Sequence, residues 1–257
     1  MAKIGLNNFR YGVLEEAEDG TPTYAGVETP GKAVSCNVEI TNNDAKLYAD
    51  DTLAESDTGF QSGTVTMGID EDDLTTMAEL LGHTIEDGQI TRKTDDAAPY
   101  VGLGRIVTKM VEGEYKYKVE FLYKVKFSEP SQENTTKGES VEFATTEIEG
   151  MVSALKNGKW SEAKTFDDKS QAIAWLEGCL GREFQINYDL NGGGGEINPL
   201  NAIAGRLVRL ANGEGLVAPN ENLRFLGWNI DRDAVEGLAE IVPYGNLVLY
   251  AIWGQQN

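Results

Sequence analysis

The chain is 257 residues long and carries 42 acidic against 22 basic residues, a formal net charge of −20 that argues against binding to a nucleic-acid backbone or an anionic lipid surface. Its length has room for one large β domain or two smaller ones, and we favour two. Two cysteines, Cys36 and Cys179, are too few for a disulfide framework, so we expect free thiols and a reducing cytoplasm.

The start of the chain lacks the apolar segment of a secretory signal, and no run of about eighteen apolar residues follows, so we expect neither secretion nor a membrane span. Residues 7–15 contain a short predicted strand, followed by a loop through residues 20–31. Residues 33–41 alternate Val34, Cys36, Val38 and Ile40 with polar neighbours, which predicts a half-buried strand. Residues 42–59 are acidic and show neither the helical nor the strand period. We interpret them as a long loop, which in a compact domain is usually functional or disordered.

A strand is predicted again over residues 60–69, and the four acids of residues 70–73 follow it. These acids lack the interleaved ligands and central glycine of a calcium loop, so we interpret them as the cap of a helix. The helix has an apolar stripe and ends at Gly82; the stripe consists of Leu74, Met77, Leu80 and Leu81. His83 is the only histidine, and with no second ligand or nucleophile nearby we expect a structural or surface role.

The segment from residue 111 to 130 predicts a strand most firmly. Its odd positions are aromatic or β-branched: Tyr115, Tyr117, Val119, Phe121, Tyr123, Val125 and Phe127. Its even positions are charged apart from one leucine: Lys116, Lys118, Glu120, Leu122, Lys124 and Lys126. This period of two predicts one buried and one wet face, with the four lysines together on the wet one. Residues 100–110 are also strand-like, and Gly113 between the two runs predicts a long hairpin.

Beyond a polar loop over residues 129–140, residues 141–155 predict a strand with a bulge at Gly150. Asn157-Gly158 predicts a turn leading into a strand at residues 160–166. Asp167 or Asp168 then caps a helix that buries Ile173, Trp175, Leu176 and Leu180.

The composition changes after Arg182, because no lysine occurs between residue 183 and the end of the chain. We therefore place a domain boundary here, with domains over residues 1–181 and 182–257. The second domain is expected to be mainly β, with strands around residues 184–188, 223–228 and 247–253. Gly192 to Gly195 lack the Lys-Ser/Thr of a phosphate loop and predict a flexible hairpin loop instead. The expected core of this domain is aromatic: Tyr188, Phe225, Trp228, Tyr250 and Trp253.

The first domain resembles the phi13-type major tail proteins of long-tailed bacteriophages. The resemblance covers about residues 1–180 and rests on the order and spacing of NNFRYGVLEE (residues 7–16), KLYADD (residues 46–51), LLGH (residues 80–83) and VEFATTEIEG (residues 141–150). It implies a tail-tube β-sandwich with flanking helices, a structural virion protein that assembles six to a ring, with rings stacked into the conduit for DNA. The implied partners are other copies of the chain, the tape measure and tail terminator or tip proteins, and DNA that passes without specific binding.

The resemblance also implies assembly in the host cytoplasm and a final place in the virion tail. Long hairpins of neighbouring subunits would form an inner barrel, and the segment at residues 42–59 would reach the adjacent ring. We expect no catalysis, no metal and no cofactor. The residues expected to take part in self-assembly are Tyr48, Asp50, Asp51, Phe60, Lys116, Lys118, Lys124 and Lys126. We expect the lysines to point away from the lumen or to be neutralised by acids such as Glu142, Glu147 and Glu149, and a plain solvated face is the alternative.

The second domain resembles the Listeria-Bacteroides repeat, a β-grasp-like module, through FQINYDLNGGGG (residues 184–195), FLGW (residues 225–228) and LYAIW (residues 249–253). This implies an accessory module on the tube exterior, and a host cell surface stays open as its partner. The alternative is a surface-binding protein in which this module contacts glycan or protein and the first domain is its scaffold. Scattered carboxylates leave a hydrolase as a third, weaker alternative.

Overall fold

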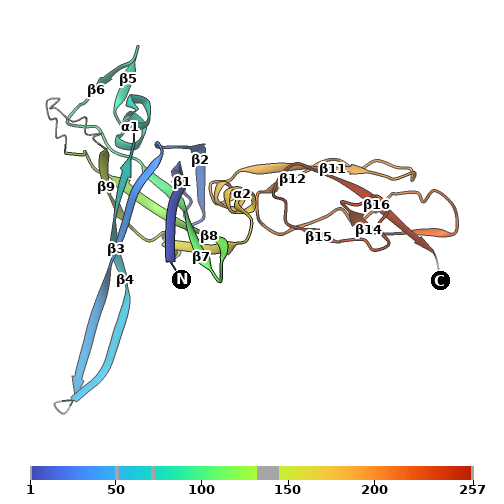
Figure 1. Ribbon diagram of the computed structural model, residues 1–257, viewed down its shortest axis with the longest axis horizontal. Coiled ribbons are helices and arrows are strands. Elements are labelled where there is room, and N and C mark those ends of the chain that lie inside the picture. Colours follow the sequence, from blue (N-terminus) through green and yellow to red (C-terminus); the bar gives the residue numbers. More distant parts are fainter. Residues whose placement is uncertain (1, 50–51, 71–72, 132–144, 256–257) are drawn as a thin grey trace. The chain divides into compact units, whose positions relative to one another are not determined.

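The protein is mainly β and forms two compact units, Met1–Ala172 and Ile173–Asn257 (Figure 1). The computed structural model describes residues 2–49, 52–70, 73–131 and 145–255. Among these residues, no helix has both the length and the apolar character needed to cross a membrane.

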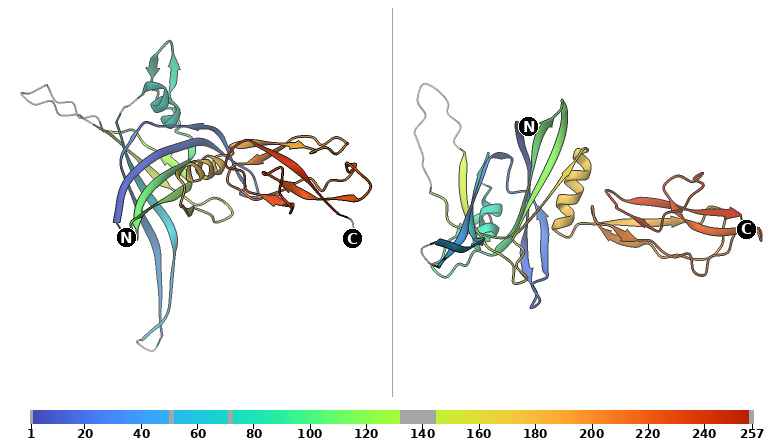
Figure 2. Two further views of the ribbon diagram at one scale, coloured as in Figure 1. Left: turned by 45° about the vertical axis from the view of Figure 1, so that its right-hand side comes forward. Right: turned by 90° about the horizontal axis from the view of Figure 1, so that it is seen from below.

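The first unit is built on one antiparallel sheet in the order β2-β1-β7-β8-β9-β4-β3, with β10 also paired to β8. Figure 2 shows the strands from two further sides. Its strands are β1 (Ala2–Glu16), β2 (Pro22–Glu28), β3 (Ala33–Ala49), β4 (Thr52–Ile69), β7 (Tyr100–Val111), β8 (Glu114–Phe127), β9 (Thr146–Val152) and β10 (Ser161–Phe166). Strands β1 and β3 lie far apart in this order yet are in contact, so the sheet curls around a core. The loop predicted at residues 20–31 is wrong in part, because β2 occupies most of this segment.

The core of the first unit lies inside this curled sheet and is closed by helix α1 (Leu74–Leu81). It contains Phe9, Tyr11, Val65, Met67, Ile69, Met77, Leu80, Leu81, Val101, Leu103, Leu122, Val125, Phe127, Ile148 and Val152. These side chains come from β1, β4, α1, β7, β8 and β9, so the burial that stabilises the unit depends on residues far apart in sequence.

Helix α1 confirms the prediction from the acidic run and apolar stripe. The Asp73 carboxylate accepts a hydrogen bond from the Thr76 amide at 3.0 Å, and Gly82 ends the helix with φ 74°. Leu74 was placed wrongly in the buried stripe, since it is 51% exposed in the first turn. A small hairpin follows, formed by β5 (Thr84–Glu86) and β6 (Gln89–Thr91).

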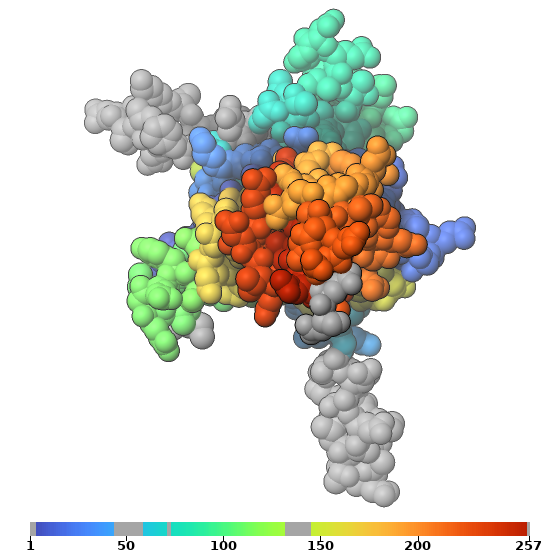
Figure 3. Space-filling view, turned by 90° about the vertical axis from the view of Figure 1, so that its right-hand side faces the viewer, coloured from blue at the N-terminus to red at the C-terminus, as the bar shows by residue number. Residues whose placement is uncertain are grey.

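The predicted long hairpin is confirmed as β7 and β8, and its tip projects from the surface of the unit (Figure 3). Glu112 and Gly113 at its turn have φ values of 52° and 89°. Two consecutive positive φ angles are typical of the tight turn whose twist matches that of the paired strands.

The simple alternation expected along β8 is wrong, because a β-bulge interrupts it. Val101 pairs with Val125 but Leu103 pairs with Leu122, so Tyr123 and Lys124 together oppose the single residue Gly102. An extra residue reverses the alternation beyond it. Leu122 and Val125 consequently share the face toward the core.

The four lysines accordingly divide between the two faces of β8. Lys116 and Lys118 lie on the face of Leu122, whereas Lys124, which is part of the bulge, and Lys126 beyond it lie on the opposite face. The expectation that they form one wet face was wrong.

The segment predicted as a loop at residues 42–59 instead belongs to a long β hairpin. The ladder between β3 and β4 begins at Ala33 opposite Ile69 and continues to Ala49 opposite Thr52. The sequence hides this, because the far part of the hairpin carries no apolar period. Its structure rests on backbone hydrogen bonds that every residue can make.

Gly150 lies in β9 without the predicted bulge, since the register to β4 is continuous from Thr146 to Val152. Close packing explains the glycine better: a Cβ here would lie 2.7 Å from Val125 Cγ1 and 2.9 Å from Phe127 Cδ1. The next turn is confirmed, with the amide of Gly158 donating to the carbonyl of Leu155 at 2.9 Å.

Helix α2 (Lys169–Cys179) is capped by Asp168, whose carboxylate accepts from the Ser170 amide at 2.7 Å. The two units divide at Ala172, within this helix, whereas the sequence placed a boundary after residue 181. The final turns of α2 pack closely in the second unit, where a Cβ on Gly178 would collide with the carbonyl of Ala204.

The second unit holds a mixed sheet in the order β12-β11-β16-β14. Its strands are β11 (Glu183–Asp189), β12 (Leu200–Ile203), β14 (Leu223–Asn229) and β16 (Leu247–Gln255), with a separate pair β13 (Val208–Arg209) and β15 (Glu240–Ile241). β11 and β16 are parallel neighbours, while β12 and β14 are antiparallel to them. The glycine segment connects β11 to β12 as a hairpin, and Gly194 is held by two backbone hydrogen bonds to Val217.

We predict that Gly150→Ala destabilises the first unit by about 1–3 kcal/mol, because the added methyl overpacks the core against Val125 and Phe127. Chemical denaturation monitored by tryptophan fluorescence measures the change. Gly5→Ala is the matched control, since a Cβ at this β1 glycine meets Thr108 at an ordinary 3.8 Å. Equal stability of the two variants would contradict the packing explanation.

Candidate assembly site

The predicted assembly residues of the β3–β4 hairpin are spread along its length. Tyr48 lies in β3 near the far end, and Asp50 and Asp51 fall outside the described residues. Phe60 lies where the hairpin meets the body of the unit, with its ring stacked on that of Trp160 at 4.5 Å between centroids. Phe60 therefore anchors the base of the hairpin, and its ring is already used within the subunit.

The β3–β4 hairpin also leaves the main sheet before it ends. Pairing of β4 with β9 stops at Gly63 opposite Val152, whereas pairing of β4 with β3 continues to Thr52 opposite Ala49. The outer part is thus a ribbon of two strands. In the sheet order of the described residues, β3 and β2 are the terminal strands, so each has an edge open for pairing.

Lys116 and Lys118 form ion pairs within their own unit. The Lys116 ammonium lies 2.7 Å from Asp167 and 3.3 Å from Glu114, and that of Lys118 lies 2.5 Å from Glu120. The hydrogen bonds that Lys116 donates to Asp167, and then to Glu114, raise the pKa of Lys116.

Lys124 and Lys126 gather beside Tyr100 on the other face of β8. Their ammonium groups lie 4.6 and 5.4 Å from the centre of the Tyr100 ring. Lys124 also pairs with Glu16 at 2.7 Å, where the glutamate side chain is only 9% exposed. Burial disfavours the charge on Glu16, but hydrogen bonds from Lys124 and the Lys156 amide outweigh it, so the pKa of Glu16 is lowered.

The acids that neutralise these lysines differ from the expected set. Glu142 lies outside the described residues, and Glu147 and Glu149 are exposed on β9. The observed partners are Glu16, Glu114, Glu120 and Asp167. Glu16 and Asp167 reach β8 only through the tertiary fold, whereas Glu114 and Glu120 lie two residues from their lysines on β8 itself and could have been read from the sequence.

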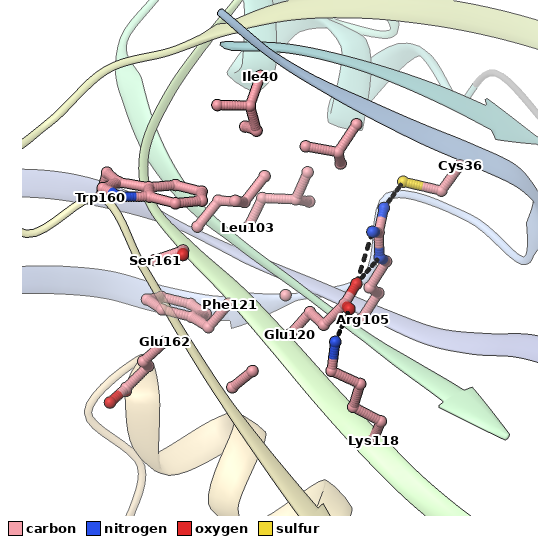
Figure 4. Close-up of a pocket in the computed structure, with 14 residues that line it drawn as sticks. Cys36, Ile40, Leu103, Arg105, Lys118, Glu120, Phe121, Trp160, Ser161 and Glu162 are labelled. Atoms are coloured by element: carbon pink, nitrogen blue, oxygen red, sulfur yellow. Dashed lines mark hydrogen bonds and ion pairs between the residues drawn. The ribbon is translucent and has the colours of Figure 1, made fainter. Parts of the chain in front are cut away.

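A charged cluster on the inner face of β7 and β8 was also missed (Figure 4). Arg105 lies directly opposite Glu120, and its Nε and Nη2 donate to the same carboxylate oxygen at 2.9 and 2.6 Å. The remaining guanidinium nitrogen donates to the thiol sulfur of Cys36 on β3. The register alone could have suggested the Arg105–Glu120 pair, but not the contact with Cys36.

This cluster borders a cavity of about 350 Å³ whose wall is otherwise largely apolar, with Leu103, Leu122 and Trp160 among its lining residues. Burial disfavours the charge on Glu120, yet the hydrogen bonds from Lys118 and Arg105 outweigh it, and the pKa of Glu120 is lowered. Burial likewise raises the pKa of the Cys36 thiol. Arg105 and Lys118 both pair with Glu120, and Arg105 also contacts Cys36 on β3. The cluster therefore holds β7, β8 and β3 together.

His83 has the structural role expected from its sequence context. Its Nδ1 lies 2.8 Å from the Asp96 carboxylate and its Nε2 lies 2.5 Å from that of Glu129. The imidazole side chain is 6% exposed and joins the end of α1 to the segment after β8. Within the part of the chain that the structure describes, no three His, Cys, Asp or Glu side chains are grouped to hold a metal ion.

The aromatic residues predicted for the second unit gather around Trp228. Trp228 is fully buried and donates its indole N–H to the carbonyl of Ala211 at 2.7 Å. The rings of Tyr188 and Phe225 lie 4.4 and 5.1 Å from it, and Trp253 packs on Phe225. Tyr250 differs, since its ring meets the guanidinium of Arg232 at 4.9 Å.

Both cysteines are free, as predicted, and their thiols each meet an arginine.

Comparisons of the chain with models of protein families and with curated proteins found no match.

We predict that Glu120→Gln weakens the pH dependence of stability in acid. A carboxylate whose pKa is lower in the folded state stabilises the fold above its unfolded pKa, and this contribution disappears as the pH falls through the folded value. The variant should be less stable at neutral pH by about 1.5–3 kcal/mol, the range for a hydrogen bond to a charged group. Urea denaturation at a series of pH values below the ordinary glutamate pKa of 4.5 measures the slope.

The exposed Glu86 of β5 provides the control, because Glu86→Gln removes a carboxylate with no place in the cluster. An unchanged slope in Glu120→Gln, matching that control, would show that the cluster does not couple Glu120 to folding.

Proposed function

We propose that this chain is a major tail-tube subunit of a long-tailed bacteriophage, which self-assembles into stacked hexameric rings that form a conduit for DNA. The observation that carries this proposal is the β3–β4 hairpin, which continues beyond the main sheet as a ribbon of two strands. The subunit number and the phage context come from the sequence resemblance of residues 1–180.

An isolated ribbon of two strands is at best marginally stable in water, since neither face buries apolar area and both edges lose backbone pairing. Residues 41–43 at its base are exposed on both faces of β3. A long extension of this kind gains stability when a neighbouring subunit covers it or pairs with it. The open edge of β3 offers the same opportunity along the strand.

The charge of the chain also supports a conduit. A net charge of −20 repels the phosphate backbone, so DNA can slide past without being held. Three of the four lysines of β8 are neutralised by acids of their own subunit, which removes the phosphate attraction that unpaired lysines would add. The proposed conduit therefore does not have to accommodate a basic stripe on β8.

The second unit fits an accessory module. The parallel pairing of its first and last long strands supports the resemblance to the β-grasp-like repeat. The alternative function, surface binding through aromatic side chains, was motivated by residues that pack together in its core. Trp228 is fully buried and the rings of Tyr188, Phe225 and Trp253 are partly buried against it, which reduces the aromatic area open to a glycan.

We predict that replacing residues 43–59 with an Asn-Gly turn abolishes or shortens tubes while the subunit stays folded. The main sheet keeps every strand, because β4 pairs with β9 only from Gly63 onward. Negative-stain microscopy of the purified protein detects rings and tubes, and circular dichroism checks the fold.

The control shortens the β5–β6 hairpin, another projecting hairpin of the same unit. Tubes should form in this control. Tubes of normal length without residues 43–59, or a wild-type protein that remains monomeric and binds glycan, would overturn the proposed function.

A further inference from the structure

The chain contains three Asn-Gly dipeptides, at residues 157–158, 191–192 and 212–213. In such a pair the glycine amide nitrogen can attack the asparagine side-chain carbonyl carbon, because glycine has no side chain to hinder the approach. The reaction needs a side-chain amide that is free to rotate and a glycine N–H that is not engaged elsewhere. The three pairs differ in how the asparagine side chain is held, and of the three glycine nitrogens only that of Gly158 donates a hydrogen bond among the described residues.

Asn157 is held at both ends of its side chain. Its Nδ2 donates to the carbonyl of Gly20 at 2.6 Å, and its Oδ1 accepts from the Lys159 amide at 3.1 Å. The attacking nitrogen, that of Gly158, donates to Leu155. Reaction at Asn157 would first have to break these three hydrogen bonds.

Asn191 is held by its amide nitrogen, which donates to the carbonyls of Arg232 and Ala251, each at 3.1 Å. Ala251 is fully buried in β16, so this contact ties the asparagine to the core of the second unit. The φ of Asn191 is 48°, a left-handed conformation that the turn and these bonds maintain.

Asn212 is exposed, and its single side-chain bond is the one that its Oδ1 accepts from the Glu214 amide at 3.1 Å. Among the described residues, neither Asn212 Nδ2 nor the Gly213 nitrogen has a hydrogen-bond partner. The side-chain amide group of Asn212 can therefore leave as ammonia, and the Gly213 nitrogen is available to attack.

We propose that Asn212 is a site of spontaneous deamidation. The Gly213 nitrogen forms a bond to Asn212 Cγ and loses its proton. The Cγ–Nδ2 bond breaks, ammonia departs, and a five-membered succinimide remains. Water then opens the ring at either carbonyl, giving aspartate or isoaspartate.

The two products have different consequences for the second unit. Aspartate keeps the main chain and adds one negative charge beside Glu214. Isoaspartate adds a main-chain carbon between Ala211, whose carbonyl accepts from Trp228 at 2.7 Å, and Gly213. Gly213 has φ 73° and packs closely on the Phe225 ring, since a Cβ would lie 2.3 Å from it. The extra atom therefore displaces a contact with the aromatic core.

The test is incubation of the full chain at mildly alkaline pH, followed by peptide mapping with mass spectrometry that separates the three sites. In the folded protein, Asn212 should react about tenfold faster or more than Asn157 and Asn191, since breaking even one hydrogen bond of about 1.4 kcal/mol slows a step tenfold. In denaturant the three rates should converge, because the surrounding bonds are then gone. Asn212→Gln should remove the fast site and leave the other two rates unchanged.

Two further results would decide the case. Aged protein should show faster hydrogen exchange around Trp228 than the Asn212→Asp variant, which has the charge without the added carbon. Comparable rates at all three asparagines in the folded chain, or a fast site at Asn157 or Asn191, would overturn the proposal.

Discussion

The bulge in β8 opposite Gly102 is the constraint on which the first unit depends. It lets one strand present Val119 and Phe121 to one face and Val125 and Phe127 to the other, and all four side chains are buried. The bulge needs glycine as its partner, because a Cβ at residue 102 would lie 2.5 Å from the Tyr24 ring and 2.7 Å from Phe121. Tyr24 also donates its hydroxyl to the carbonyl of Tyr123 at 2.9 Å, which holds the bulge in place.

The same bulge organises the charges of the unit. It directs Lys116 and Lys118 to the side of Glu120 and Arg105, and Lys124 to the side of Glu16 and Tyr100. Lys116 and Lys124 then meet acids outside β8, Asp167 and Glu16, whereas Lys118 pairs with Glu120 of its own strand. Such pairs contribute modestly to stability where they are exposed, but they fix the neighbouring strands in register and keep β8 from acting as a basic stripe.

The open edges of β2 and β3 are the part of the subunit that most needs a partner to pair with. The described sheet curls but ends at β2 and β3, and β3 continues into a ribbon that the main sheet does not support. Folded proteins cover such edges or use them for pairing. Assembly into a tube would cover these edges with copies of the same chain. The second unit, which has its own aromatic core, would not have to take part.

The sequence by itself determined the β7–β8 hairpin, helix α1 with its Asp73 cap and Gly82 end, the Asp168 cap, and the aromatic core of the second unit. These features depend on period, turn chemistry and capping, which act over a few residues. Only the tertiary structure decided the bulge at Tyr123, the ribbon at residues 42–59, and the partners Glu16, Asp167 and Cys36. The bulge and these partners depend on contacts between residues far apart in the chain. The ribbon pairs residues close in sequence through backbone hydrogen bonds, which require no apolar pattern that the sequence would show.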